Sequence, residues 1–202
     1  MDDMIWGQLN SFREEKCSYA KESLVQRMKS ISFLRVLFFV AVLLCLPAMC
    51  ASPRNCSAEI KVYFSPNGGI REQVIRAMEL ATSSIDIAIF NCTSRQLGDS
   101  IVKAEKRGVR IRVVTDKRKA SGKKSKIGYL VQKGVAVRLV KGRGNGNMHN
   151  KFAIFDKKLV LIGSYNWTDK AEQVNYDNAV FIDAPNVVST YQREFDRLWK
   201  KQ

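Results

Sequence analysis

The sequence predicts an α/β protein in which helices flank a mixed, largely parallel sheet. Three observations support this class. From Ile60 onward, short apolar runs of strand length alternate with longer stretches whose apolar residues recur at helical spacing. Turn residues such as Gly, Pro and Asn separate many of these segments. Two apolar runs, Phe152–Phe155 and Leu159–Ile162, follow each other so closely that they indicate a hairpin, which adds an antiparallel part to the sheet.

Each element follows from its local pattern. Short apolar or alternating runs predict strands over Ile60–Phe64, Ile85–Phe90, Val109–Thr115, Val135–Val140, Phe152–Phe155, Leu159–Ile162 and Ala179–Ile182. Apolar residues three and four positions apart predict helices over Ile70–Thr82, Gln96–Arg107, Lys126–Lys133 and Val187–Trp199. Gly108 and Gly134 follow two of these helices and are typical helix ends. Lys157-Lys158 predicts the turn of the hairpin.

The chain divides into three parts. Its 202 residues are enough for one domain preceded by a leader. Residues 1–27 are polar and mixed in charge, so we expect a disordered extension or a stretch that translation from Met28 would omit. Residues 28–51 are expected to form a signal peptide or an N-terminal membrane anchor. Residues 57–202 are expected to form the folded domain.

The leader has the pattern of an export signal. Lys29 and Arg35 flank the apolar block Val36–Leu46, and small residues follow it. The block is short for a membrane span, which needs about 20 residues. We therefore expect an exported protein, secreted or periplasmic after cleavage, with an uncleaved anchor and membrane association through residues 31–51 as the alternative.

The cysteines bear on the compartment and on metal binding. The sequence has five cysteines, of which Cys56 and Cys92 would remain after cleavage. In an oxidising compartment these two could form a disulfide, and the alternative is two unrelated thiols. No Cys/His spacing indicates zinc, and we expect no metal and no cofactor.

Positive charge is concentrated in one segment. The formal net charge is +15, and Lys103–Arg143 alone holds 15 basic and 2 acidic residues. Such a segment is often only a solvated face, but this density predicts a surface for nucleic acid or for anionic lipid. The expected contacts are Lys117, Arg118, Lys119, Lys123, Lys124 and Arg143. The glycine-rich stretch Gly142–Asn147 is expected to be a flexible approach to the next segment.

Polar residues gather at one end of the predicted hairpin. His149, the only histidine in the sequence, stands two positions before Lys151, so both side chains face the same side of an extended segment. Ser164 and Asn166 repeat this spacing after the second strand. An imidazole can attack phosphorus, and an ammonium and an amide can hold phosphate oxygens. A bare H-x-K pair would more often only cap a strand, so this chemistry depends on the longer pattern.

That pattern is H-x-K-x4-D-x6-G-S-x-N. It is complete at His149, Lys151, Asp156, Gly163, Ser164 and Asn166. It resembles the HKD signature of the phospholipase D superfamily. The resemblance extends over about Ile60–Trp199 and includes N-Y-D-N-A-V at Asn175–Val180 and E-F-D-R-L-W at Glu194–Trp199. It is strongest to short, single-motif members such as bacterial plasmid-type endonucleases and mitochondrial cardiolipin hydrolase (Zucchini).

The resemblance implies a role for each matching residue. His149 would be the nucleophile, Lys151 and Asn166 would bind phosphate, and Ser164 would give hydrogen-bonding support. Asp156 is usually structural in such enzymes. Asp177 stands where relatives tend to carry Glu, and it would orient the imidazole. Relatives with two motifs supply two histidines, so a chain with one motif is expected to form a homodimer with a shared active site.

The expected function is that of a metal-independent phosphodiesterase acting through a phospho-histidine intermediate. Nucleic acid is the first candidate substrate, because the basic segment is long. A phospholipid head group, of cardiolipin or phosphatidylcholine, is the alternative, and a non-catalytic nucleic-acid or membrane-binding protein is the third hypothesis. Tyr165 and Trp167 could stack on bases or pack in the core.

Overall fold

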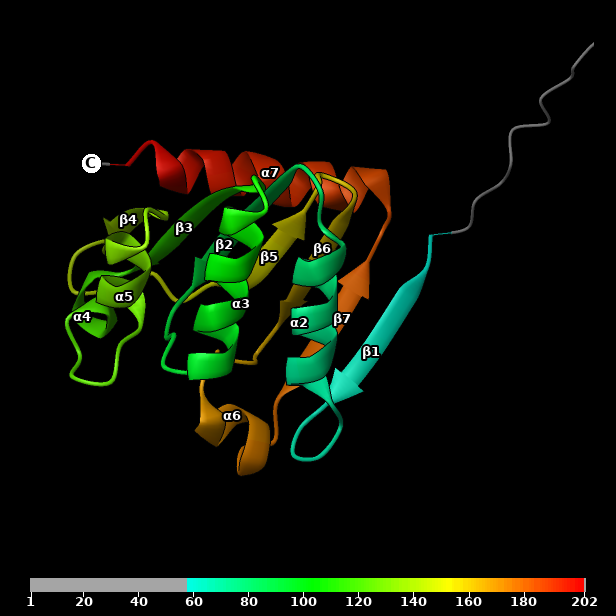
Figure 1. Ribbon diagram of the computed structural model, residues 1–202, viewed down its shortest axis with the longest axis horizontal. Helices are drawn as coiled ribbons and strands as arrows, with labels where there is room; N and C mark the ends of the chain where they lie inside the picture. The colour runs from blue at the N-terminus through cyan, green and yellow to red at the C-terminus, as the bar shows by residue number, and fades with distance from the viewer. Residues whose placement is uncertain (1–57, 202) are drawn as a thin grey trace, which may run out of the picture. The chain divides into compact units, whose positions relative to one another are not determined.

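The computed structural model describes residues 58–201 (Figure 1). The expected extension (1–27) and the expected signal or anchor (28–51) therefore lie outside the described residues, as does Cys56. Within residues 58–201, none of the helices has the length and apolar character needed to span a bilayer.

The described residues form seven strands and six helices. The strands are β1 (Ile60–Phe64), β2 (Ser84–Ile89), β3 (Arg110–Asp116), β4 (Ala136–Val140), β5 (Lys151–Phe155), β6 (Leu159–Gly163) and β7 (Asn178–Ile182). The helices are α2 (Ile70–Leu80), α3 (Arg95–Lys106), α4 (Lys117–Ala120), α5 (Ile127–Gln132), α6 (Asp169–Gln173) and α7 (Pro185–Trp199). Every predicted strand and helix is present, with small shifts at the ends. The pattern did not predict α4 and α6, because helices of four and five residues are too short to show a period.

All seven strands join one sheet in the order β1-β7-β6-β5-β2-β3-β4. The expected α/β class with a mixed sheet is confirmed. The sheet is not largely parallel, however: only β2, β3 and β4 pair in parallel, and the other four pairings are antiparallel. Parallel neighbours need a crossover, which α3 and α5 provide. No helix separates β4 from β5, and β5 runs antiparallel to β2. The tight β5–β6 turn then makes β6 antiparallel to β5.

Helices cover both faces of the sheet (Figure 1). On one face, α2 and α3 bury Val74 and Leu97 against strand residues such as Ile87. On the other face, α7 buries Val188 and Phe195 in a second cluster with Ile154, Val160 and further strand residues. Each fully buried side chain of this size contributes about 1.5–3 kcal/mol. The two faces together form the core that holds the strand ends in place.

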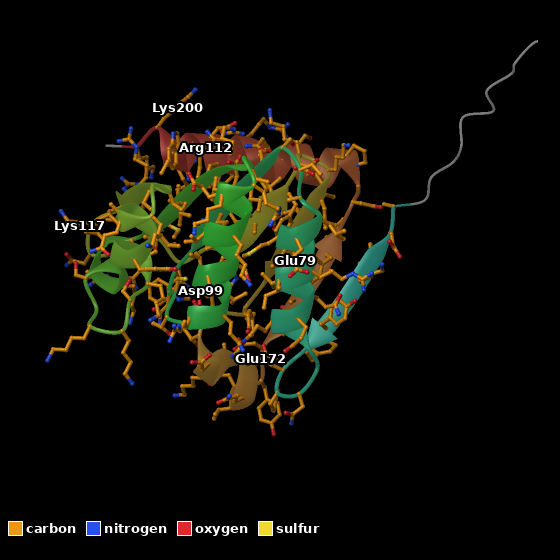
Figure 2. All side chains as sticks on the ribbon, viewed as in Figure 1. Glu79, Asp99, Arg112, Lys117, Glu172 and Lys200 are labelled. Carbon is orange, nitrogen blue, oxygen red and sulfur yellow. The ribbon has the colours of Figure 1, made fainter. Side chains whose placement is uncertain are left out.

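A buried ionic network attaches α7 to the sheet. The Asp86 carboxylate on β2 is 1% exposed and accepts hydrogen bonds from the Arg112 guanidinium at 2.8 and 2.7 Å. The same guanidinium, labelled in Figure 2, donates to Asp196 on α7 at 2.9 Å. Gln192 of α7 also donates to Asp86 at 2.8 Å. This network sets the position of α7 and hence of Tyr191, which lines the pocket described below.

Strand direction brings residues that are distant in the sequence to the same end of several strands, which is called here one edge of the sheet. Because β1, β5, β6 and β7 pair with their neighbours in antiparallel fashion, the start of β5 lies beside the end of β6, and the start of β7 lies beside the end of β1. The same edge carries α6 and the β1–α2 turn (Figure 1). His149, Ser164, Asp177 and Ser65 all lie directly next to these strand ends.

Candidate active site

Four of the sequence-predicted residues line one pocket. His149, Lys151, Ser164 and Asn166 surround a pocket of about 440 Å³, with Tyr191 of α7 on its wall. The two halves of the motif are 13 residues apart or more, and the β5–β6 hairpin brings them together. The structure thus places imidazole, ammonium, hydroxyl and amide groups around a single space.

The Lys151 ammonium lies against the His149 imidazole. Its Nζ atom is 3.1 Å from Nδ1 and 3.3 Å from Nε2, and it donates to the backbone oxygen of His149 at 2.7 Å. The Phe90 ring packs against both groups, with its centroid 4.4 Å from that of the imidazole and 5.1 Å from the Lys151 ammonium. The sequence did not single out Phe90, because it follows β2, far from the motif in the chain.

The surroundings favour the neutral form of the imidazole. Partial burial and the neighbouring Lys151 ammonium lower the pKa of His149 below its ordinary value, and Asp116 opposes this shift. Burial also lowers the pKa of Lys151, against the opposing charge of Asp177. A neutral imidazole has a free lone pair at neutral pH, which is the form that can act as a nucleophile.

Ser164 connects the end of β6 to the start of β7. Its hydroxyl donates to Asp177 Oδ1 at 2.6 Å and accepts from the Asn178 N–H at 3.1 Å. The N–H of Asp177 in turn donates to the Ser65 hydroxyl at 3.1 Å. At Gly163 a Cβ would collide with the backbone oxygen of Asn178, so only glycine allows β7 to approach this closely. Ser65 was missed by the sequence analysis, because only the β1–β7 pairing brings it here.

Two buried oxygens in this region have no hydrogen-bond partner within the described chain. They are Asn166 Oδ1 and Asp177 Oδ2. Buried polar atoms are nearly always paired, and leaving one unpaired costs about 1–3 kcal/mol. Each of these oxygens can accept a hydrogen bond from water, from a ligand or from another chain.

Asp156 does not belong to this pocket. It lies at the opposite end of β5, where its carboxylate accepts from the backbone N–H groups of Thr82, Ser83 and Ser84 at 2.8–3.2 Å. Partial burial raises the pKa of Asp156, but these backbone donors outweigh it and hold the pKa well below the ordinary value. Asp156 completes the motif in sequence but lies apart from the pocket, and its place agrees with the structural role that the family resemblance implied.

A second, larger groove lies beside Asn166. It encloses about 740 Å³ and shares Asn166 with the pocket. Its basic lining residues are Arg95, Lys123, Lys124, Lys126 and Lys170. Of the basic residues predicted to bind a polyanion, only Lys123 and Lys124 line this groove. The sequence missed the other three, because they come from separate elements.

The other predicted basic residues lie outside the groove. Lys117 projects from α4 at the outer edge of the molecule (Figure 2). The Lys119 ammonium lies 5.2 Å from the centre of the Phe90 ring, and Arg143 is exposed on the loop after β4. Arg118 is occupied by contacts to that same loop.

Several expectations about single residues are now decided. Tyr165 and Trp167 are 3% and 2% exposed, so they pack in the core and do not stack on a ligand. The Cys92 thiol is buried and has no disulfide partner among residues 58–201, and burial raises its pKa to about 12. Its pairing with Cys56 stays a prediction. Among residues 58–201, no three His, Cys, Asp or Glu side chains are grouped as metal ligands.

Known proteins resemble this chain over most of its length. Residues 74–199 match the family described as "Cardiolipin synthase, PLD-like domain". Mitochondrial cardiolipin hydrolase of Xenopus tropicalis is 35% identical over 166 residues, which are 82% of this chain and 76% of the relative. The human protein of the same name is 35% identical over 169 residues, covering 82% of this chain and 66% of the relative.

Solved structures agree with these sequence relatives. The phospholipase D family member Nuc from Salmonella typhimurium superimposes with a TM-score of 0.65 at 29% identity, covering 70% of this chain and 94% of the other. NucT from Helicobacter pylori gives a TM-score of 0.66 at 27% identity, covering 71% and 96%.

These relatives correct the expected localisation. Export to a secreted or periplasmic state, or an N-terminal membrane anchor as its alternative, was predicted from residues 28–51. The similar curated proteins are instead named mitochondrial. A basic and apolar leader is shared by several kinds of targeting segment, so its pattern does not define the compartment. The disulfide prediction loses its main support as well, because it relied on export.

From the motif residues gathered in one pocket and from relatives that span most of its length, we conclude that this chain is a phosphodiesterase belonging to the phospholipase D superfamily, among the single-motif members.

Proposed function

We propose that the protein hydrolyses phosphodiesters without a metal ion, through a covalent phospho-histidine, and that its main substrate is nucleic acid. His149 is the nucleophile, and Lys151 and Asn166 hold the non-bridging phosphate oxygens. The contact between the Lys151 ammonium and the imidazole supports this assignment, because an oxygen of a phosphate bound to His149 would lie within reach of the same ammonium.

The reaction has two steps. In the first, an imidazole nitrogen of His149 forms a bond to phosphorus while the bond from phosphorus to the leaving oxygen breaks, and an imidazolium acid protonates that oxygen. In the second, the imidazole that acted as the acid, which is now neutral, takes a proton from water. The water oxygen attacks phosphorus, and the P–N bond to His149 breaks. His149 and the acid both return to their starting states.

The acid must come from a second copy of the chain, because the sequence contains one histidine. We therefore propose a homodimer with a shared site, in which the partner subunit's His149 is the acid. The unpaired Asp177 Oδ2 supports this arrangement, since no hydrogen bond joins Asp177 to His149 within the described chain and a partner's imidazole N–H would satisfy that oxygen. Asp177 would then orient an imidazole, as the family resemblance implied.

The sheet offers a surface for this second copy. Ile60, Val62 and Phe64 on β1 are all at least half exposed. Ile60 is paired with Ile182, which packs in the cluster on the α7 side, so this apolar row lies on the same face as α7, on the edge strand that α7 does not cover. Ile162 on that face lines the pocket. A partner covering the row would therefore also approach His149.

The basic groove is the observation that carries the choice of nucleic acid. Five cationic side chains line a groove that begins at Asn166, and its one acidic residue, Asp169, is paired with Arg71 at 2.9 Å. A lipid head group carries one or two phosphates, whereas this row of cations extends well beyond a single phosphate. It suits a polymer with a charge at every residue.

A second candidate substrate is cardiolipin. The relatives at 33–36% identity are named mitochondrial cardiolipin hydrolases, and we extend both the substrate and the mitochondrial location to this chain as alternatives to test. The chemistry at phosphorus is the same for both substrates. Only the groups on either side of the phosphate differ.

A substrate panel tests the proposal. The full-length protein is incubated in EDTA with single-stranded RNA, single-stranded DNA, plasmid, and vesicles that contain cardiolipin. We expect cleavage of nucleic acid and none with His149→Ala. Turnover of cardiolipin alone would reverse the choice of substrate, and turnover by His149→Ala would overturn the mechanism. When the reaction with a ³²P-labelled oligonucleotide is quenched, label should remain on the protein. That label should be acid-labile and base-stable, as a phosphoramidate requires.

A further inference from the structure

Hydrogen bonds within the backbone hold the two ends of the loop before His149 together. Gly142 N–H donates to the Gly146 oxygen at 3.1 Å, and Gly146 N–H donates to the Arg143 oxygen at 2.9 Å. Lys141 and Asn147 pair as an isolated bridge. A Cβ at Gly142 would collide with the backbone of Gly146, so glycine there permits the tight crossing. The sequence analysis explained these glycines by flexibility, whereas Gly142 has a second use that it missed, the close packing of the loop.

A buried carboxylate holds the far end of this loop. Asp116, at the end of β3, is 1% exposed. Its Oδ2 accepts from the N–H of Met148, the residue before His149, at 3.0 Å. Its Oδ1 accepts from the N–H groups of Arg118 and Lys119 at 3.1 and 3.2 Å, which caps α4. The Met148 side chain is itself buried in the cluster on the α7 side. One carboxylate therefore joins the β3–α4 corner to the backbone next to His149.

The Arg118 side chain makes the second connection. Its guanidinium donates to the backbone oxygens of Asn145 and Gly146, at 3.1 and 3.5 Å, and to the side-chain oxygen of Asn147. All three contacts come from one nitrogen, Nη2, so the guanidinium is attached to the loop by one end and the donors on Nε and Nη1 have no partner in the described chain. Lys117, its neighbour on α4, has no such contact and projects outward (Figure 2). Neighbouring cations on one helix thus have different surroundings.

We propose that Asp116 and Arg118 are positioning residues that hold the backbone before His149, so that its imidazole meets the phosphate in line; this rests on the proposed role of His149 as nucleophile. Arg118 is then part of the scaffold of the site and not a contact to the substrate backbone. Nucleophilic attack requires reacting atoms about 3–3.5 Å apart, and a misplacement of about 1 Å can cost 100-fold in rate. A loop held at both ends prevents such a shift.

The test separates positioning from polyanion binding by using a substrate with a single phosphate. Steady-state kcat and KM are measured on bis(4-nitrophenyl) phosphate and on a single-stranded DNA oligonucleotide for the wild type, Arg118→Ala, Arg118→Lys and Asn147→Ala. Rates are expressed per site of folded protein, with the folded fraction taken from an unfolding curve of the same preparation, so that partial unfolding lowers the count and not the rate. Asn147→Ala removes one of the three Arg118 contacts from the loop side and leaves the net charge unchanged.

Arg107 provides a matched control. Its guanidinium also donates to backbone oxygens, those of Met78 and Glu79 at 2.7 and 3.3 Å, but at the end of α2 away from the pocket. Arg107→Ala removes one charge and a comparable structural contact. It is expected to lower the melting temperature and to leave kcat per site unchanged.

We expect Arg118→Ala and Asn147→Ala to lower kcat per site on the small diester about 10- to 100-fold, with KM within about twofold. Arg118→Lys should not restore it, because the lysine side chain is one bond shorter and its ammonium does not reach the position of Nη2. The double variant should be no slower than the worse single variant, since both remove one interaction. The inference is overturned if kcat per site on the small diester matches that of the wild type and only KM for DNA rises. Loss of activity in His149→Ala, measured alongside, shows that such a failure belongs to the inference and not to the proposed function.

Discussion

The two ends of the β5–β6 hairpin carry residues of the same motif, but they differ in whether their buried or partly buried oxygens have hydrogen-bond partners. At the open end, His149 and Ser164 face a pocket, and Asn166 Oδ1 and Asp177 Oδ2 are buried without partners. At the turn end, both oxygens of the Asp156 carboxylate accept hydrogen bonds from Thr82, Ser83 and Ser84, at the start of β2 and just before it.

The contrast separates two uses of polar groups within one motif. A saturated carboxylate lowers the free energy of the folded state, whereas an unpaired oxygen raises it unless a partner arrives. The turn end therefore contributes to stability and the open end to reaction. Substitutions at the two ends should affect different measurements, and each prediction below tests that separation.

The largest effect is expected at the open end. His149→Ala should lower turnover of any phosphodiester substrate at least about 10⁴-fold, because no other imidazole exists in the sequence. The melting temperature should stay within a few degrees, since the His149 side chain is exposed. Activity assays and calorimetry on the same preparation measure both. A large fall in stability would contradict the proposed separation.

The next effect concerns the turn end. Asp156→Asn should lower the free energy of unfolding by about 2 kcal/mol at neutral pH, because an amide offers one acceptor oxygen where several donors converge. A depressed pKa stabilises the folded state above the unfolded-state value, about 3.9. The difference between wild type and variant should therefore be full above about pH 5 and shrink as the pH falls below about 4. Turnover per active site should be unchanged.

Asp183 offers a matched control for this variant. Its carboxylate accepts only one backbone bond, from the Glu59 N–H at 2.6 Å, at the far end of the β1–β7 pair. Asp183→Asn keeps an oxygen for that single donor and should cost less than about 1 kcal/mol. Equal losses in the two variants would show that saturation of Asp156 is unimportant.

The sequence predicted elements and motif residues well, because both depend on local order. Apolar periodicity identified the seven strands and four of the helices, and motif spacing identified His149, Lys151, Ser164 and Asn166. Strand direction was harder, since periodicity describes which face is buried and not which way the neighbour runs.

What the sequence missed depends on tertiary contacts. Ser65 and Phe90 reach the site only through the pairing of β1 with β7 and of β2 with β5. Arg118 was assigned to a polyanion surface because its charge is visible in the sequence, while its acceptors on the next loop are not.

A smaller effect returns to the open end. Ser164→Ala removes the 2.6 Å bond that orients the Asp177 carboxylate, and we expect turnover per site to fall about tenfold, which corresponds to about 1.4 kcal/mol. Stability should change little, because the hydroxyl is at an exposed position. Ser189→Ala, which removes a hydroxyl bonded within α7 at 2.9 Å, serves as the control and should leave turnover unchanged. Equal turnover in the two variants would mean that Ser164 does not act through Asp177.

The smallest effect should have the opposite sign and lies in the turn itself. Asp156 and Lys157 both have positive φ, 52° and 56°, and Lys158 N–H donates to the Phe155 oxygen at 2.9 Å, so the turn has the geometry of type I′. A lysine in this conformation is strained by about 1 kcal/mol, and glycine relieves the strain at some cost in chain entropy. Lys157→Gly should therefore stabilise the fold by about 0.5 kcal/mol in chemical denaturation. Turnover per site should be unchanged, because the turn end can gain stability without any change at the open end. A change in turnover would show that the hairpin transmits strain from one end to the other.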